Sequence, residues 1–216
     1  MPSIARHQRD VGTQTTMVQK KQGKKKGKRN HADDEIPLLP DTNQIKEIRL
    51  KWLHNGKSRP DFAIEPSQGQ ESVWDFPRPP IIQPVRSELK VMRGDVLLAK
   101  TSRGVRVIET AGAPTYYFPP EDVKTAKFAL GEQGSLCEWK GYSQPLLINE
   151  DEVGWRYVRM FQAFSTLYLW PAFYPSMVDC FIDDKKVDAQ PGGYYGGWVT
   201  DTLTGPIKGS PGSQGW

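Results

Sequence analysis

The last 27 residues, 190–216, constrain the fold of this chain more than any other stretch. Eleven of them are Gly or Pro, a content typical of a flexible tail, yet four aromatic residues are interleaved with the glycines: Tyr194, Tyr195, Trp198 and Trp216. Disordered segments are poor in aromatic residues because they have no core in which to bury them. Glycines beside bulky rings instead indicate a backbone that passes through tight turns with the rings packed around it. We therefore expect an ordered, loop-rich wall of a folded domain.

Charge is unevenly distributed along the chain. The first 31 residues hold nine Lys or Arg and one acidic residue, whereas the rest holds 20 basic and 24 acidic residues, a net charge of −4. The folded part is thus expected to be mildly acidic, which argues against a sequence-specific nucleic-acid surface. Residues 1–41 are polar and lysine-rich and are predicted to be a disordered tail. The basic run at residues 20–29 fits nuclear import, loose polyanion contact or plain solvation, and these alternatives stay open.

Cysteine content and hydropathy predict a soluble intracellular protein, either cytoplasmic or nuclear. The two cysteines, Cys137 and Cys180, are too few for a disulfide framework, although a single bridge stays open. The first ten residues lack the apolar core of a secretion signal. The longest apolar run, residues 167–173, is far shorter than the roughly 20 residues of a membrane helix, so no membrane partner is expected.

Residues 42–70 are predicted to hold a short helix followed by a linker. Thr42 or Asn43 can cap a helix over residues 43–54, which presents one apolar face and ends before Gly56. Packing of this face on the domain is the simplest role for it. Residues 58–70 return to a loop composition.

Residues 71–216 are predicted to form one β domain. An Arg93-Gly94-Asp95 turn separates two strand-like runs, as in a hairpin, and Pro120 can begin a helical turn. We predict a mainly β, single compact domain with a curled-sheet or barrel-like architecture. The expected strands cover residues 88–92, 96–100, 105–110, 115–118, 155–158, 166–170 and 178–182.

A loop pattern in which lysine precedes glycine occurs twice, at residues 137–141 (Cys-Glu-Trp-Lys-Gly) and 205–209 (Gly-Pro-Ile-Lys-Gly). If the loops face each other, Lys140 and Lys208 can hold one phosphate or carboxylate between them. The simpler alternative is two solvated surface turns. Zinc is not expected, because a structural site needs four Cys or His ligands and the folded part adds only His54 to its two cysteines.

Glu109 and Asp122 are the candidate catalytic carboxylates. Across a cleft they can act as acid and base, or bind Mg²⁺ together with substrate phosphates. Alternatively, Asp122 caps the helical turn and Glu109 pairs with an arginine. Tyr116 and Tyr117 point to opposite faces of a regular strand, so one lies in the core, and Tyr117 is taken as the candidate that faces the site.

Several rings and glycines are candidates for the walls of a pocket. Most of the aromatic residues must pack in the core, but Trp198 follows Gly196-Gly197, where the absence of side chains lets a ligand approach the backbone. Trp139 adjoins Lys140 in the first loop. The chain contains no phosphate-binding P-loop, nucleophile-elbow or His-Glu-x-x-His motif, so ordinary ATPase, esterase and zinc-protease functions lack support.

In combination, these motifs resemble the domain of unknown function numbered 427, from about residue 71 to the end. The resemblance implies a mainly β fold similar to the Mss4-like, β-tent class, in which some relatives bind zinc through paired loops. The loops at residues 137–140 and 205–208 would then occupy those positions without the metal. The family is sometimes labelled nucleotidyltransferase-like. The matching motifs are Glu71–Pro80, Glu109-Thr110, Tyr117–Val123, Cys137–Gly141, Trp155–Tyr157, Ala172–Pro175, Gln190–Thr200 and Gly205–Gly209.

These observations leave three hypotheses for function. The first is a pocket for an anionic or phosphorylated small molecule, binding through Lys140 and Lys208 and extending to a nucleotidyltransferase-like enzyme that uses Glu109. The second is a non-catalytic protein-interaction module that uses the aromatic and glycine loops. The third is a structural domain delivered by its basic tail.

Overall fold

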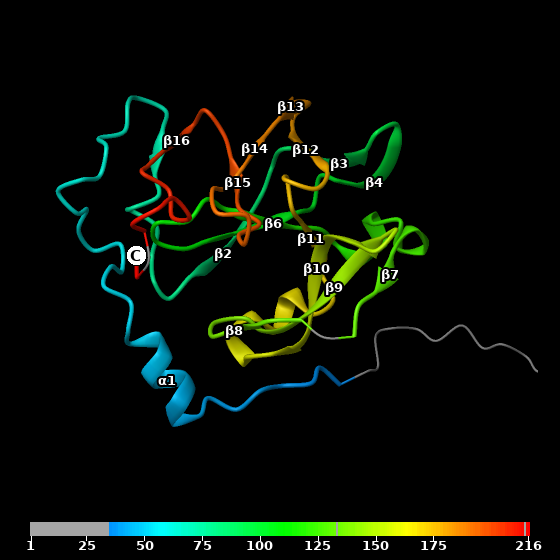
Figure 1. Cartoon of the computed structure of the whole chain (residues 1–216), viewed down its shortest axis with the longest axis horizontal. Coiled ribbons are helices and arrows are strands. Elements are labelled where there is room, and N and C mark those ends of the chain that lie inside the picture. The colour runs from blue at the N-terminus through cyan, green and yellow to red at the C-terminus, as the bar shows by residue number, and fades with distance from the viewer. Residues whose placement is uncertain (1–34, 133, 214) are drawn as a thin grey trace, which may run out of the picture. The chain divides into compact units, whose positions relative to one another are not determined.

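The computed structural model describes residues 35–132, 134–213, 215 and 216, which lie in one compact unit from Glu35 to Trp216 (Figure 1). The predicted tail and its basic run fall almost entirely on residues 1–34, outside the described residues. The predicted boundary of that tail is residue 41, and the segment just before it forms backbone hydrogen bonds with the domain. The Leu39 amide donates to the Met160 carbonyl at 2.8 Å, and the Met160 amide donates to the Pro37 carbonyl at 3.0 Å. The chain is therefore part of the fold before residue 41.

The described fold is mainly β, as predicted, and its strands form three larger sheets. One sheet contains β7 (Ala129–Leu130), β8 (Leu136–Cys137), β9 (Gly141–Ile148), β10 (Asp151–Met160) and β11 (Ala172–Phe173). The second contains β3 (Leu89–Arg93), β4 (Val96–Thr101), β12 (Asp179–Ile182) and β13 (Lys185–Lys186). The third contains β2 (Ile81–Pro84), β5 (Val105–Ile108) and β6 (Thr115–Tyr117). Among the described residues these sheets do not close into a barrel.

Two short strand pairs complete the β structure. The parallel pair β1 (Glu71–Ser72) and β16 (Leu203–Thr204) joins the start of the predicted domain to its C-terminal loops. The antiparallel pair is β14 (Asp188–Ala189) and β15 (Trp198–Val199). The glycine-aromatic C-terminus is thus tied into the fold by strands, as the interleaved rings predict.

The hairpin and the helical turn are confirmed. β3 and β4 flank the Arg93-Gly94-Asp95 turn, and a 3-10 helix, η1 (Pro120–Asp122), begins at Pro120. A second 3-10 turn, η2 (Thr125–Lys127), follows. The N-terminal helix is shorter than expected: α1 (Asn43–Arg49) begins at the Thr42 cap, whose hydroxyl accepts from the Ile45 amide at 3.3 Å.

The predicted strand at residues 166–170 is wrong. Most of this region belongs to a 3-10 helix, η3 (Gln162–Leu167), and the turn after it. Phe164 and Leu167 are buried and lie three residues apart, which is the repeat of a 3-10 helix rather than of a strand. A single 3-10 turn contains too few residues for its three-residue repeat to be distinguished, from sequence alone, from the two-residue repeat of a strand.

The aromatic residues divide between separate buried clusters. Tyr116 packs with Trp198 in one cluster, and Tyr117 packs with Trp155 and Tyr157 in another, so the two adjacent tyrosines point to opposite faces as predicted. Trp216 joins a third cluster, where its ring stacks on Phe62 at 5.1 Å. The last residue of the sequence therefore packs against the body of the domain.

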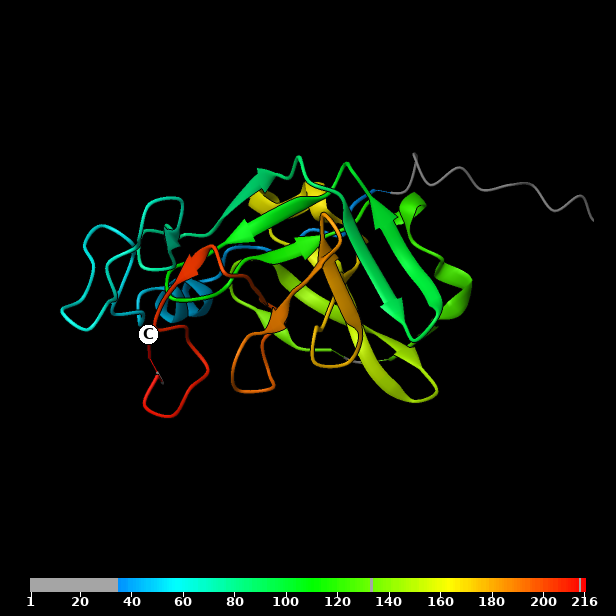
Figure 2. The same ribbon diagram turned by 90° about the horizontal axis from the view of Figure 1, so that it is seen from above.

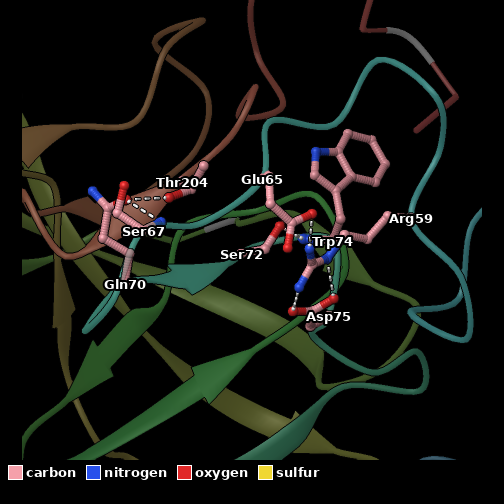
Figure 3. Close-up of polar contacts among 8 residues, drawn as sticks. All are labelled: Arg59, Glu65, Ser67, Gln70, Ser72, Trp74, Asp75 and Thr204. Carbon is pink, nitrogen blue, oxygen red and sulfur yellow. Dashed lines mark hydrogen bonds and ion pairs between the residues drawn. The ribbon is translucent and has the colours of Figure 1, made fainter.

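The loop before β1 is fixed to the C-terminal segment by polar contacts. In Figure 3 the Arg59 guanidinium lies between the carboxylates of Glu65 and Asp75, and the Asp75 contact is bidentate at 2.7 Å. Gln70 accepts from the Thr204 hydroxyl at 3.0 Å, which links β1 to β16. Exposed ion pairs of this kind stabilise weakly, so their main effect is to fix the path of the loop. Figure 2 shows this region beside the C-terminal segment.

No helix in the described part of the chain is long and apolar enough to cross a membrane.

Candidate functional site

A cavity of about 330 Å³ opens between the edges of two sheets and the C-terminal loops. Both predicted lysines, Lys140 and Lys208, line it, and we call it the lysine cavity. Glu109, Tyr117 and Gly197 line it as well. The structure thus brings together five of the residues that sequence reasoning selected, although they lie far apart along the chain.

Strand register explains why the walls of the cavity face inward. In β6, Thr115 and Tyr117 lie two residues apart and share the cavity face, while Tyr116 between them faces the other core. Val107 of β5 pairs with Thr115, and Glu109 follows two residues later on the same side. Trp155 and Tyr157 of β10 repeat the same alternation on the opposite wall.

Lys208 is held in place by backbone and side-chain contacts. Its amide donates to the Ala111 carbonyl at 2.8 Å, and its carbonyl accepts from the Gln190 side-chain amide at 2.9 Å. The ammonium donates to a main-chain oxygen of Trp216 at 2.8 Å and lies 3.7 Å from the centre of the Trp52 ring. Because these contacts leave the residue only 8% exposed, the charge sits in a largely desolvated position.

Burial and the repulsion of the Arg78 guanidinium lower the pKa of Lys208 to about 8, against the opposing attraction of Glu109 and Glu138. A lysine in free solution titrates about two units higher. Lys208 is therefore a cation near neutral pH whose charge is lost within a mildly alkaline range.

Glu109 forms an ion pair inside the cavity. The Arg78 Nε donates to Glu109 Oε1 at 3.1 Å, and the rest of the Arg78 guanidinium donates to the carbonyls of His54 and Thr110. The alternative in which Glu109 pairs with an arginine is thus the one observed. Arg78 also lies over the Trp52 ring at 4.5 Å, so two cations share the same aromatic surface.

Lys140 projects from the turn between β8 and β9. Burial by itself would lower the pKa of its ammonium, but Cys137 and Tyr117 beside it, which attract the ammonium in their ionised forms, raise that pKa above its ordinary value. Glu109 acts in the same direction. Neither Lys140 nor Lys208 belongs to any of the ion pairs formed among residues 35–132 and 134–213. Neither ammonium group is therefore paired with an Asp or Glu side chain in the described structure.

The floor of the cavity is aromatic and contains an unsatisfied hydroxyl. Tyr117 is fully buried, and its hydroxyl has no hydrogen-bond partner in the described structure. Burial raises the pKa of Tyr117 to about 12, so this hydroxyl stays protonated. A buried unpaired hydroxyl costs about 1–3 kcal/mol, and such groups in native proteins call for an explanation.

Three predicted site residues lie elsewhere. Asp122 accepts from the Thr101 hydroxyl at 2.6 Å and from Arg103 at 2.9 Å, away from the cavity lining, so it does not meet Glu109. Trp198 is fully buried in the core, where its indole N–H donates to the Phe173 carbonyl at 3.2 Å. β15 turns its ring away from the cavity, although its neighbour Gly197 lines it.

Trp139 also points away from the lysine cavity. Its ring lies under the Arg49 guanidinium at 5.0 Å and lines a second hollow of about 390 Å³ beside α1. Trp139 and Lys140 therefore line different hollows although they are adjacent in the sequence.

Packing against Gln190 and Ala113 requires a glycine at position 197, and sequence reasoning did not identify this requirement. A Cβ atom there would lie 2.1 Å from Gln190 Oε1 and 2.7 Å from the Ala113 carbonyl oxygen. Gln190 itself accepts from the Ala113 amide at 3.0 Å. The absence of a side chain at Gly197 therefore makes room for the Gln190 side chain. Gln190 in turn donates to the Lys208 carbonyl.

Arg78 and Trp52 are functional candidates that sequence reasoning missed. Both lie outside the loops that carry the repeated lysine, and their positions depend on contacts with residues far along the chain. The apolar face predicted for residues 43–54 includes Trp52 and indicated that this ring packs on the domain. An apolar pattern gives no information about which cations contact the ring. No signal in the sequence identifies the partner of Arg78.

No group of three or more His, Cys, Asp or Glu side chains that could hold a metal ion occurs among the described residues. Both cysteines are free, and Cys180 is buried in the core.

Comparison with known families adds one match. Residues 81–184 match the family model described as a domain of unknown function, DUF427. The resemblance is thereby confirmed over the region that carries Glu109, Tyr117, Cys137 and Lys140. None of the curated proteins compared with the chain matches it.

The lysine cavity extends beyond the matched DUF427 residues. Trp52 and Arg78 precede residues 81–184, and Tyr195 and Lys208 follow them. The cavity is therefore formed by the DUF427 segment together with both flanking segments of this chain.

Proposed function

We propose that the lysine cavity binds a small anionic molecule that carries a phosphate or carboxylate group. The observation that supports this most strongly is the convergence on one cavity of Lys140 and Lys208, neither of which is paired with an Asp or Glu side chain in the described structure. Arg78 adds a third cation and Glu109 and Glu138 supply two carboxylates, so the titratable lining carries a net positive charge near neutral pH. A positive hollow in a mildly acidic domain favours an anionic ligand.

The aromatic lining suits a ligand with a flat or apolar part. Trp52 and Tyr195 lie near the ammonium of Lys208, and Trp155 and Tyr157 form the buried wall. The volume lies near the lower end of the roughly 300–1,000 Å³ that is usual for small-molecule sites. The ligand is therefore small, about the size of a sugar phosphate or a nucleotide fragment.

Nucleotidyl transfer through a Mg²⁺-binding carboxylate pair is less well supported. Asp122 is engaged with Arg103 and Thr101, and Glu109 is paired with Arg78. Binding, rather than this chemistry, is the function that we propose for the charged part of the cavity.

A thermal-shift panel tests the proposal. We expect inorganic phosphate, pyrophosphate, sugar phosphates or nucleotides, with and without Mg²⁺, to raise the melting temperature, because a ligand that binds only the native state stabilises it. K140M and K208M should each abolish the shift. The matched control is K127M, since Lys127 is exposed and does not line the cavity. A flat response across the panel, or shifts equal in all variants, contradicts the proposal.

A protein-interaction module is the second candidate, and Tyr194 favours it. Its ring is 67% exposed and packs edge-to-face on Tyr195 at 5.3 Å. Exposed aromatic residues are enriched where proteins bind partners. Loss of partner capture by Y194A, with the anion response intact, would identify this second function.

A further inference from the structure

Cys137 lines the lysine cavity and lies at the start of the turn that presents Lys140. β8 and β9 pair Cys137 with Gly141, and this closes a tight turn with the thiol and the ammonium three residues apart. Both side chains line the cavity, and the thiol is free and partly buried. The attraction between Cys137 and Lys140 is the largest of the effects that raise the Lys140 pKa. A thiol beside an ammonium group is the usual environment of a reactive cysteine, because the cation favours the thiolate.

The unpaired Tyr117 hydroxyl is an independent observation at the same place. It belongs to a fully buried residue that lines the cavity, and it has no acceptor in the described structure. A protonated hydroxyl of a residue that lines the cavity is suited to donate to an oxygen on which negative charge develops. Besides burial, the charge of Cys137 raises the pKa of Tyr117, so the two side chains lie close to each other.

We propose that Cys137 is a nucleophile for small acyl compounds, esters or thioesters, with Lys140 as its counter-ion and Tyr117 as the donor to the carbonyl oxygen. The apolar wall formed by Val107, Trp155 and Tyr157 accommodates the acyl group. This activity shares Lys140 with the proposed function, but it requires neither Lys208 nor the binding of an anion.

The reaction balances with water as its second reactant. The Cys137 thiolate attacks the carbonyl carbon, an S–C bond forms, and the carbonyl electron pair moves to the oxygen that Tyr117 hydrogen-bonds. The ester C–O bond then breaks, and the departing alkoxide takes a proton from the Lys140 ammonium. Water attacks the resulting thioester, releases the carboxylic acid, and returns one proton to Lys140 and the thiolate to Cys137.

Two uncharged probes separate the roles of these residues. Iodoacetamide alkylates a thiolate by displacement and creates no oxyanion, whereas p-nitrophenyl acetate acylates through a carbonyl. We expect both reagents to modify Cys137, located by peptide mass mapping, and a burst of p-nitrophenolate with the second. Cys180 is the internal control, because it is buried in the core and should stay unmodified in the native protein.

The variants make the assignment testable. K140M should slow both reactions about tenfold or more, since it removes the charge that favours the thiolate, and K140R should restore them. Y117F should slow acetylation about tenfold or more and leave alkylation unchanged, because only acylation needs the donor. K127M should alter neither rate. Circular dichroism establishes that each variant is folded.

Three outcomes overturn the proposal: no modification of Cys137, acetylation of lysines in place of Cys137, or a Y117F variant that slows both reactions equally. The last would show that Tyr117 acts only through structure. The probes carry no charge, so failure of anion binding and failure of this thiol chemistry are distinguished.

Discussion

The Lys208 ammonium lies 3.7 Å from the centre of the Trp52 ring. This contact joins the last loop of the chain to the segment after α1, and neither residue belongs to the matched DUF427 region. The same ring carries the Arg78 guanidinium at 4.5 Å. One indole thus stabilises two cations that would otherwise repel each other in a desolvated site.

Replacement of Trp52 should weaken the site and the fold together. W52A removes two cation–π contacts and the hydrogen bond from the indole N–H to Glu138 at 2.8 Å. We expect a loss of about 2 kcal/mol in unfolding free energy, measured by urea denaturation, because a desolvated cation–π contact contributes about that amount. The phosphate response in thermal shift should fall in parallel. L50A is the control, since Leu50 is 83% exposed, and an effect of W52A no larger than that of L50A refutes the role of the ring.

Anion binding should weaken as pH rises through about 8. Lys208 loses its charge there, because burial and Arg78 lower its pKa to about 8. Isothermal titration with pyrophosphate at pH 7 and pH 9 checks this. In K208M the step near pH 8 should be absent, and a step that persists in K208M would assign it to another group.

The same pKa predicts how stability changes with pH. The folded-state pKa of Lys208 lies below that of an unfolded lysine, so between about pH 8 and 10.5 the unfolded state binds more protons. The destabilisation that Lys208 causes is complete below pH 8 and is relieved as pH rises through this window. K208M should therefore be more stable than the wild type at pH 7, and the difference should shrink by pH 10. Urea denaturation at both pH values measures it.

Removal of the unpaired Tyr117 hydroxyl should stabilise the protein. The hydroxyl is buried without a partner, so Y117F loses no hydrogen bond and relieves a desolvated polar group. We expect a gain of about 1 kcal/mol in chemical denaturation. Y157F serves as a comparison within the same aromatic cluster. A loss of stability in Y117F would mean that the hydroxyl has a partner in solution.

The glycines that follow the two lysines should tolerate no side chain. Gly141 has φ of +126° and Gly209 has φ of +117°, and a Cβ would lie 2.0 Å from the Arg159 carbonyl oxygen and 1.9 Å from that of Pro191. Each Gly→Ala variant should lose about 3 kcal/mol or more, because strain and collision add. G193A is the control, with φ of +68° and nothing within 4 Å of its Cβ. It should lose only about 1 kcal/mol. If thermal melts show that G193A lowers the melting temperature as much as G141A and G209A do, this explanation is contradicted.

The sequence predicted local features well where a few neighbouring residues determine them. The Arg93-Gly94-Asp95 hairpin, the Thr42 cap and the turn at Pro120 depend on backbone preferences within about four residues. The repeated Lys-Gly pair is also local, since each glycine adopts a backbone conformation that other residues rarely adopt. The strand predicted at residues 166–170 failed because a short run of large, strand-favouring residues fits a 3-10 turn equally well.

Of the candidate site, the sequence identified the residue types and only part of the membership. Lys140, Lys208, Glu109 and Tyr117 meet at one cavity, whereas Asp122 and Trp198 are engaged elsewhere. Whether a polar side chain joins the cavity depends on which hydrogen-bond partner lies next to it in the folded structure. Asp122 has Arg103 nearby, and the Trp198 indole has the Phe173 carbonyl.

By itself, the sequence determined that this is a mainly β chain whose glycine-aromatic C-terminus is folded, because turn preferences and the burial of rings act along short stretches. Only the tertiary structure decided that Trp52 and Arg78 join Lys208, and that Cys137 and Lys140 line the same cavity as Tyr117, whose hydroxyl is unpaired. Those relationships arise from packing between segments far apart in the chain, and the desolvation that alters the charge of each group exists only once the segments have packed.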